Sequence, residues 1–137
     1  MPNKHYRIIL DTNLWISFLI TKNYSKLDNI LFSGNSTLVF SQELLYEFID
    51  VVKRPKLQKY FSQTDIEDIL KTIEEYGEFI KTSTNITVCR DPKDNFLLSL
   101  AVDGHADYLL TGDTALLELK KIEKTKIITI SEFLSKK

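Results

Sequence analysis

Four acidic residues stand where predicted strands give way to helices or turns. Asp11 directly follows one apolar run and Asp113 closely follows another; the remaining two are Glu47 and Asp94. Crowded carboxylates resist ionisation, so such a cluster is costly unless cations lie within it. Oxygen ligands of this kind suit Mg²⁺ or Mn²⁺, and such ions would activate a water and stabilise the leaving oxygen in phosphodiester cleavage. The residue types therefore indicate a metal-dependent centre for phosphate chemistry.

Each acid also has an ordinary structural use. Asp11 and Asp94 suit the N-cap of a helix, where Asp is common. Asp113 suits a turn after Gly112, and Glu47 suits an exposed helix face. For one residue alone the structural use is the simpler explanation. It is weaker for the set, because all four residues would have to reach the ligand-binding edge of the sheet by coincidence.

Other metal-binding chemistries have little support. Cys89 is the only cysteine, so it forms no disulfide within the chain and a cysteine-based zinc site is disfavoured. His5 and His105 are the only histidines, and they lie outside any metal-ligand spacing. We expect both histidines in loops or at the surface.

The elements that would position the acids alternate along the chain. Short apolar runs predict five strands, and periodic apolar positions predict helices between them. This alternation predicts an α/β fold with a mainly parallel five-stranded sheet and helices on both faces, so that the acids share the carboxyl edge of the sheet. The predicted strands are residues 6–10, 37–40, 85–89, 108–110 and 126–130, and the predicted helices are 14–19, 24–32, 41–52, 64–81 and 96–102.

The size and composition fit one globular domain over residues 1–137. The chain is 43% hydrophobic and 27% charged, which is ordinary for a globular protein. Its apolar runs fall short of the ~20 residues that a membrane helix needs, and the first is too short for a secretory signal. We therefore expect a cytoplasmic protein.

The formal net charge of −1 does not by itself indicate nucleic-acid binding. Two local clusters of basic residues are more informative, because an acidic centre cancels them in the sum. Either cluster would meet phosphates through sequence-independent contacts, although solvated lysines at helix ends explain each cluster equally well. The first contains Lys53, Arg54, Lys56 and Lys59, and the second contains Lys120, Lys121, Lys124 and Lys126.

The ordered acids resemble the pattern of the PIN-domain family. The resemblance is carried by Asp11-Thr12-Asn13 after an apolar strand, by Glu47, by Asp94 before an apolar helix, and by Thr111-Gly112-Asp113. The segments Val51–Leu57 and Arg90–Asn95 look like those of a bacterial group described as toxin components of toxin–antitoxin systems. The likeness extends over almost the whole chain.

This resemblance implies an α/β/α sandwich and an endoribonuclease that depends on Mg²⁺ or Mn²⁺. The four acids would match the metal-binding acids of the family. Asn13 and Thr111 would lie beside them, and Asp91 would be an outer ligand. The resemblance further implies an RNA substrate, an inhibitory antitoxin protein and a homodimer.

Other functions remain compatible with the same residues. A DNA nuclease or a phosphatase would use the same acidic metal site, because carboxylates select metal and phosphate and not the sugar. A phosphatase with a covalent aspartyl intermediate would need a second Asp where Asn13 stands, which disfavours it. A receiver-like regulatory or binding module shares the expected sheet but needs fewer acids.

Overall fold

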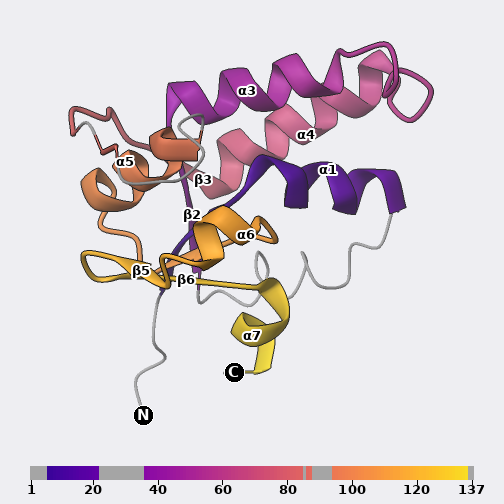
Figure 1. Cartoon of the computed structure of the whole chain (residues 1–137). Coiled ribbons are helices and arrows are strands. Elements are labelled where there is room, and N and C mark those ends of the chain that lie inside the picture. The colour runs from indigo at the N-terminus through magenta and orange to yellow at the C-terminus, as the bar shows by residue number, and fades with distance from the viewer. Residues whose placement is uncertain (1–5, 22–35, 85, 88–93, 136–137) are drawn as a thin grey trace.

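The computed structural model describes residues 6–21, 36–84, 86–87 and 94–135. Within them, strands and helices alternate along most of the chain, as the apolar pattern predicts (Figure 1). The strands are β1 (Tyr6–Leu10), β2 (Ser36–Phe40), β3 (Gly77–Phe79), β4 (Tyr108–Leu110), β5 (Lys121–Ile122) and β6 (Thr125–Ile128). The helices are α1 (Thr12–Thr21), α3 (Gln42–Val52), α4 (Gln63–Tyr76), α5 (Asn95–Asp103), α6 (Thr114–Leu117) and α7 (Ile130–Ser135).

The described strands form one sheet in the order β3-β2-β1-β4-β6-β5. All pairs are parallel except β5 with β6, which form an antiparallel hairpin. The α/β fold with a mainly parallel sheet is therefore confirmed. In the described part of the chain the sheet has six strands where the sequence predicts five, since the lysine-rich segment before β6 contributes the two-residue strand β5. A strand of that length carries too little apolar pattern to be read from sequence.

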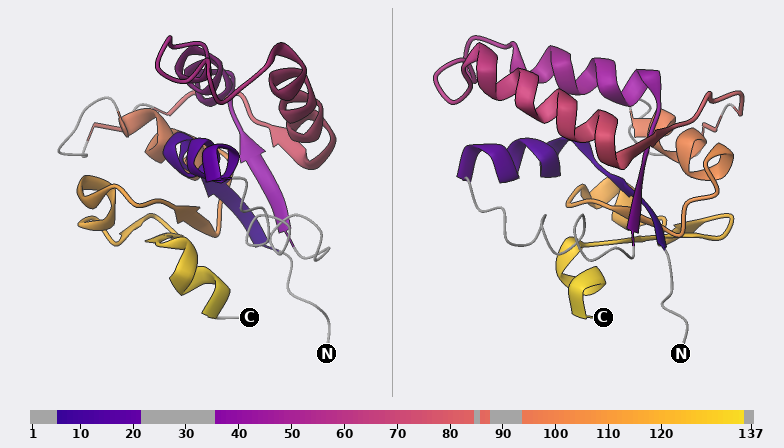
Figure 2. Two further views of the ribbon diagram at one scale, coloured as in Figure 1. Left: turned by 90° about the vertical axis from the view of Figure 1, so that its right-hand side faces the viewer. Right: turned by 180° about the vertical axis from the view of Figure 1, so that it is seen from behind.

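Helices flank the sheet. In the views of Figures 1 and 2, α3 and α4 run side by side and α1 lies next to α3. Helix α7 lies apart from that group, against the first residues of β1 and β4. There the ring of Phe133 contacts the rings of Tyr6 and Tyr108, with centroids 5.9 and 5.3 Å apart.

The third predicted strand is not found among the described residues. Ile86 and Thr87 lie outside any strand, and the rest of the predicted segment, residues 85 and 88–89, falls outside the described residues. The sheet instead takes its third strand from Gly77–Phe79, so the helix predicted for residues 64–81 ends at Tyr76. At the edge of the sheet Glu78 and Phe79 are exposed, so this strand lacks the apolar alternation that identifies one.

Other predicted elements agree more closely with the structure. Ser41 caps α3 by accepting a 3.1 Å hydrogen bond from the backbone N–H of Leu44. The predicted helices 14–19 and 96–102 lie within α1 and α5, and the last strand runs from Thr125 to Ile128. The helix predicted for residues 24–32 falls outside the described residues.

The core lies between the sheet and its helices. The last three residues of β1 and of β2 are almost fully buried, as are Leu97 and Leu98 of α5. Trp15 of α1 is also buried and packs its ring against those of Phe40 and Phe48. The packed strands therefore provide an edge from which the acidic residues project. The described helices include none with the length and apolar character of a membrane span.

Candidate functional site

The carboxyl ends of β1 and β4 bring Asp11 beside Thr111. The two strands pair in parallel with Leu10 opposite Leu110, so the next residues of both strands are neighbours. The backbone N–H of Asp11 donates a 3.1 Å hydrogen bond to the carbonyl of Leu110. The hydroxyl of Thr111 donates a 2.7 Å hydrogen bond to Oδ2 of Asp11. Sheet register thus places the first acid against a buried hydroxyl.

The surroundings of Asp11 disfavour its ionised form. The residue is only 5% exposed, and this burial raises its pKa above the usual value. The hydrogen bond from Thr111 and a 3.3 Å bond from the backbone N–H of Asn13 oppose the rise, because both favour the ionised form. The negative charge of Asp113 raises the pKa further. A cation would relieve both the burial cost and the repulsion.

Asp113 has a structural role and also lies near Asp11. It caps the short helix α6 by accepting a 2.7 Å hydrogen bond from the backbone N–H of Ala115. Its own backbone N–H donates to the hydroxyl of Thr111 at 3.0 Å. The turn therefore fixes Asp113 to the same hydroxyl that contacts Asp11, so the structural use and the acidic cluster coexist.

Asp94 is the N-cap residue of α5, but its side chain does not cap the helix. It precedes α5 with helical backbone angles and makes no side-chain capping bond to that helix. Its Oδ2 atom is buried. The structure therefore does not support the capping role that Asp94 could have from sequence alone.

Glu47 comes from a different layer of the fold. It lies on α3, and its Oε2 accepts a 2.6 Å hydrogen bond from the hydroxyl of Thr12. Thr12 is 3% exposed and directly follows Asp11. Sequence reasoning missed Thr12, because a pairing across 35 residues between two helices leaves no local pattern. The only available signal was its position between Asp11 and Asn13.

A cavity of about 250 Å³ lies among the four predicted acids, and Thr111 is not part of its lining. All four predicted acids contribute to its lining, together with Asn13 and Arg54, whereas the neighbouring Lys53 and Lys56 do not. Asp91 falls outside the described residues. The full lining is Asp11, Thr12, Asn13, Glu47, Val51, Arg54, Asp94 and Asp113. We refer to this cavity as the acidic cavity.

The lining of the acidic cavity fits a hard divalent cation. Its donors are carboxylate, amide and hydroxyl oxygens, which suit Mg²⁺ or Mn²⁺, and its described lining contains no imidazole or thiol. In the described part of the chain, no group of three or more Asp, Glu, His or Cys side chains is arranged to hold a metal ion by itself. Mg²⁺ usually keeps several waters and binds only one or two carboxylates directly, so it does not require such a group.

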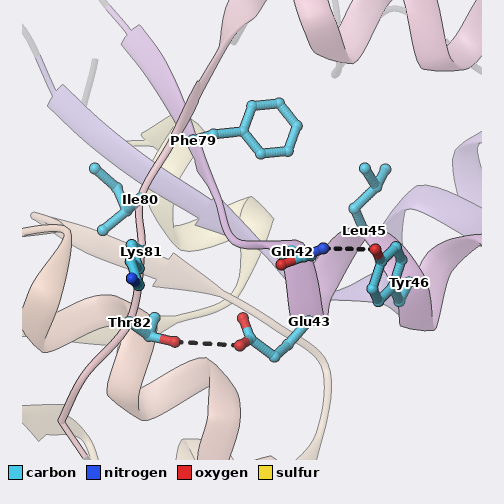
Figure 3. A pocket seen from close by; sticks show the side chains of 8 residues that line it. All are labelled: Gln42, Glu43, Leu45, Tyr46, Phe79, Ile80, Lys81 and Thr82. Carbon is cyan, nitrogen blue, oxygen red and sulfur yellow. Dashed lines mark hydrogen bonds between the residues drawn. The ribbon is translucent and has the colours of Figure 1, made fainter.

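A larger groove of about 570 Å³ has a different character (Figure 3). One wall is formed by residues 79–82, and the other by Gln42, Glu43, Leu45 and Tyr46 of α3. The hydroxyl of Thr82 donates a 3.4 Å hydrogen bond to Oε1 of Glu43 across them. Tyr46 and Phe79 are exposed in this groove. Glu43 is the single acid among its described lining residues, so the groove lacks the acidic cluster that would bind a cation.

The remaining candidates lie away from the acidic cavity. His105 is exposed, as expected, and lines a separate pocket with Glu123 and Lys124. It has a left-handed backbone φ of 51°. The second basic cluster belongs to the β5–β6 hairpin and its flanks and does not line the acidic cavity. His5 and Cys89 fall outside the described residues.

Comparisons with known proteins agree with this arrangement. A family model described as the PIN domain matches residues 7–115. The uncharacterized protein MJ1680 of Methanocaldococcus jannaschii is 31% identical over 121 residues, covering 86% of this chain and 77% of that protein.

A solved structure also shares the fold. It is the crystal structure of VapBC2 from Rickettsia felis bound to a DNA fragment from their promoter. The likeness covers 88% of this chain and 96% of that one, with a TM-score of 0.61 and 20% identity. The match of the family model over most of the sequence, together with the shared fold, shows that this chain belongs to the PIN domain family, whose members are generally nucleases.

Proposed function

We propose that this protein is a metal-dependent endoribonuclease that cleaves RNA phosphodiester bonds at the acidic cavity. The observation that carries the proposal is the convergence of four acids from separate parts of the chain on one cavity. The raised pKa of Asp11 adds support, because an uncompensated buried carboxylate is unfavourable and a divalent cation would compensate it.

The four acids would share the work of holding Mg²⁺ or Mn²⁺. Asp11 and Asp94 would bind one ion directly, and Glu47 and Asp113 would complete its shell or hold a second ion. When bound, a divalent cation lowers the pKa of water and offsets the charge that develops on the phosphate. The cavity would supply the geometry for both effects.

The remaining polar residues would orient the acids. Thr111 holds Oδ2 of Asp11, and the backbone N–H of Asn13 lies near Oδ1. The carboxylates would act as ligands and proton acceptors, not as covalent nucleophiles. The proposed role of Asp91 as an outer ligand rests on the sequence alone.

Basic residues beside the acidic cavity would bind the RNA backbone. Arg54 lines the cavity, while Lys53 and Lys56 are exposed beside it in the chain. Phosphate contacts of this kind position a nucleic acid without reading its sequence. Their placement supports a polyanionic substrate that extends beyond the cavity.

We further propose that the protein is the toxin of a toxin–antitoxin pair. VapBC2, which shares the fold, is a complex of this type. A small antitoxin protein would then inhibit cleavage, and relatives of this kind commonly form homodimers. Purification with and without the product of a neighbouring gene, followed by measurement of cleavage and molecular mass, would test both partners.

The first experiment is cleavage of a mixed RNA panel by purified protein with Mg²⁺, Mn²⁺ or a chelator. DNA of equal length and sequence is tested in parallel, and phosphate release from a monoester tests for a phosphatase. We expect metal-dependent RNA cleavage that Asp94→Asn reduces about 100-fold or more, since even indirect metal contacts are worth 10–100-fold. Glu47→Gln is tested beside it, and Glu43→Gln is the matched control for that variant, because Glu43 lies on the same helix as Glu47 but lines the larger groove.

Several outcomes would contradict the proposal. Preferential cutting of DNA would reassign the substrate, and phosphate release without chain cleavage would indicate a phosphatase. Cleavage that persists in chelator would remove the metal from the mechanism. An inactive protein that instead accepts a phosphoryl group from a small phosphodonor would favour the receiver-like module.

A further inference from the structure

Thr12 is a buried polar residue whose contact has no part in the function proposed above. The residue is 3% exposed, and its hydroxyl donates a 2.6 Å hydrogen bond to Oε2 of Glu47. A bond of this length to a carboxylate is charge-assisted and stronger than a bond between neutral groups. The contact therefore restrains Oε2 of Glu47.

The bond joins two elements that enter the acidic cavity from different directions. Thr12 is the first residue of α1 and follows Asp11 in the chain, whereas Glu47 lies in the middle of α3. The two helices contact each other, and both residues line the acidic cavity. The position of Glu47 relative to Asp11 thus depends on a side-chain contact as well as on helix packing.

Glu47 needs such a contact more than the aspartates do. A glutamate has more rotatable bonds than an aspartate, so fixing its carboxylate costs more conformational entropy. Ordering the carboxylate before a cation arrives removes that cost from cation binding. Because Oε2 is engaged with Thr12, Oε1 remains the atom for a cation or its water.

We propose that Thr12 is a positioning residue that orders Glu47 for divalent-cation binding. This inference rests on the proposed function, since it concerns the same cavity. Thr111 acts in a parallel way on Asp11, but it also accepts a bond from the backbone N–H of Asp113 and so supports a turn as well. The hydroxyl of Thr12 bonds to the candidate ligand Glu47, which makes Thr12 the cleaner test.

A purely structural role for Thr12 is the competing explanation, because the bond also ties α1 to α3. Thr12→Val keeps the shape of the side chain and removes the hydroxyl, whereas Thr12→Ser keeps the hydroxyl and removes the methyl group. If valine prevents folding, Thr12→Ala replaces it. The unfolding temperature of every variant, measured in chelator, records the structural contribution separately.

The test is calorimetric titration of Mn²⁺ into the purified full chain, with RNA cleavage measured alongside. We expect Thr12→Val to weaken Mn²⁺ binding by about 10-fold or more, as the loss of an outer-shell partner does, and Thr12→Ser to restore most of the affinity. In a Glu47→Ala background, Thr12→Val should change the affinity by less than about 2-fold, because a residue that acts through another adds nothing once that other is removed.

The inference would be overturned by wild-type Mn²⁺ affinity in folded Thr12→Val. An equal loss in the Glu47→Ala background would also overturn it, since Thr12 would then act independently of Glu47. A wild-type protein that neither binds Mn²⁺ nor cuts RNA would reject the proposed function and this inference together. Metal-dependent cleavage with an unchanged Thr12→Val variant would reject the inference alone.

Discussion

The hydroxyl of Thr111 lies 2.7 Å from Oδ2 of Asp11, although 99 residues separate the two in the chain. The contact follows from the parallel pairing of β1 and β4, which sets Leu10 opposite Leu110 and so brings the residues that follow them together. Both side chains are buried where the strands end. The position of the first acid is thus a property of the sheet and not of a flexible loop.

The charge of Asp11 should destabilise the metal-free protein. Its folded-state pKa is raised mainly by burial, so folding favours the protonated form and the ionised form carries a cost above that pKa. We expect Asp11→Asn to raise the unfolding temperature in chelator near neutral pH. The difference should shrink as the pH falls through the folded pKa toward the ordinary value, where the wild-type group is neutral too.

Adding Mn²⁺ provides the control for this prediction. A cation that binds only the folded state raises the unfolding temperature of the wild-type protein, and Asp11→Asn should lose most of that rise. A lower unfolding temperature for Asp11→Asn in chelator would show that the carboxylate stabilises the fold through its hydrogen bonds.

Arg54 should contribute more to cleavage than its basic neighbours. It lines the acidic cavity. Its exposed i,i+4 ion pair with Asp50, at 3.4 Å, is weak and would compete little with a phosphate for the guanidinium. We expect Arg54→Gln to lower kcat/KM for RNA about 10-fold, the value of one charge-assisted contact, and to reduce the salt dependence of binding. Lys56→Gln should affect mainly KM. Equal effects of the two substitutions on kcat would contradict a contact inside the cavity.

Gly104 should be sensitive to a single added methyl group. A Cβ at this position would lie 2.7 Å from Cγ1 of Val39 and 2.9 Å from the carbonyl oxygen of Leu100. We expect Gly104→Ala to lower the free energy of unfolding by about 1–3 kcal/mol through overpacking between α5 and β2, measured by urea denaturation. Gly112→Ala is the matched control, because a Cβ there meets nothing within 4 Å. Comparable losses at both glycines would argue against a packing effect.

Phe133 should secure α7 to the sheet. It is 1% exposed and packs edge-on against Tyr6 and Tyr108. We expect Phe133→Ala to cost about 3–5 kcal/mol of unfolding free energy, and the more conservative Phe133→Leu to cost clearly less. Chemical denaturation of both variants measures the difference. A loss below about 1 kcal/mol for the alanine variant would mean that α7 contributes little to the fold.

The sequence was sufficient to predict the α/β fold and its parallel sheet, because four strands carry continuous or near-continuous apolar runs. It was also sufficient to single out the four acids, since three of them follow an apolar run or precede an apolar helix. Their assignment as ligands remains a proposal. The sequence pattern failed at β3, whose exposed residues at the edge of the sheet leave no periodic signal, and at the two-residue strand β5.

The spacing of apolar residues along a segment reflects which of its side chains are buried. The sequence alone therefore determined the types of the main elements and the identity of the acids. Only the tertiary structure decided which side chains meet. It paired Thr12 with Glu47 across two helices, and it brought Arg54, but not Lys53 or Lys56, to the acidic cavity. These choices depend on sheet register and helix packing, which join residues far apart in the chain and leave no trace in the spacing of neighbours.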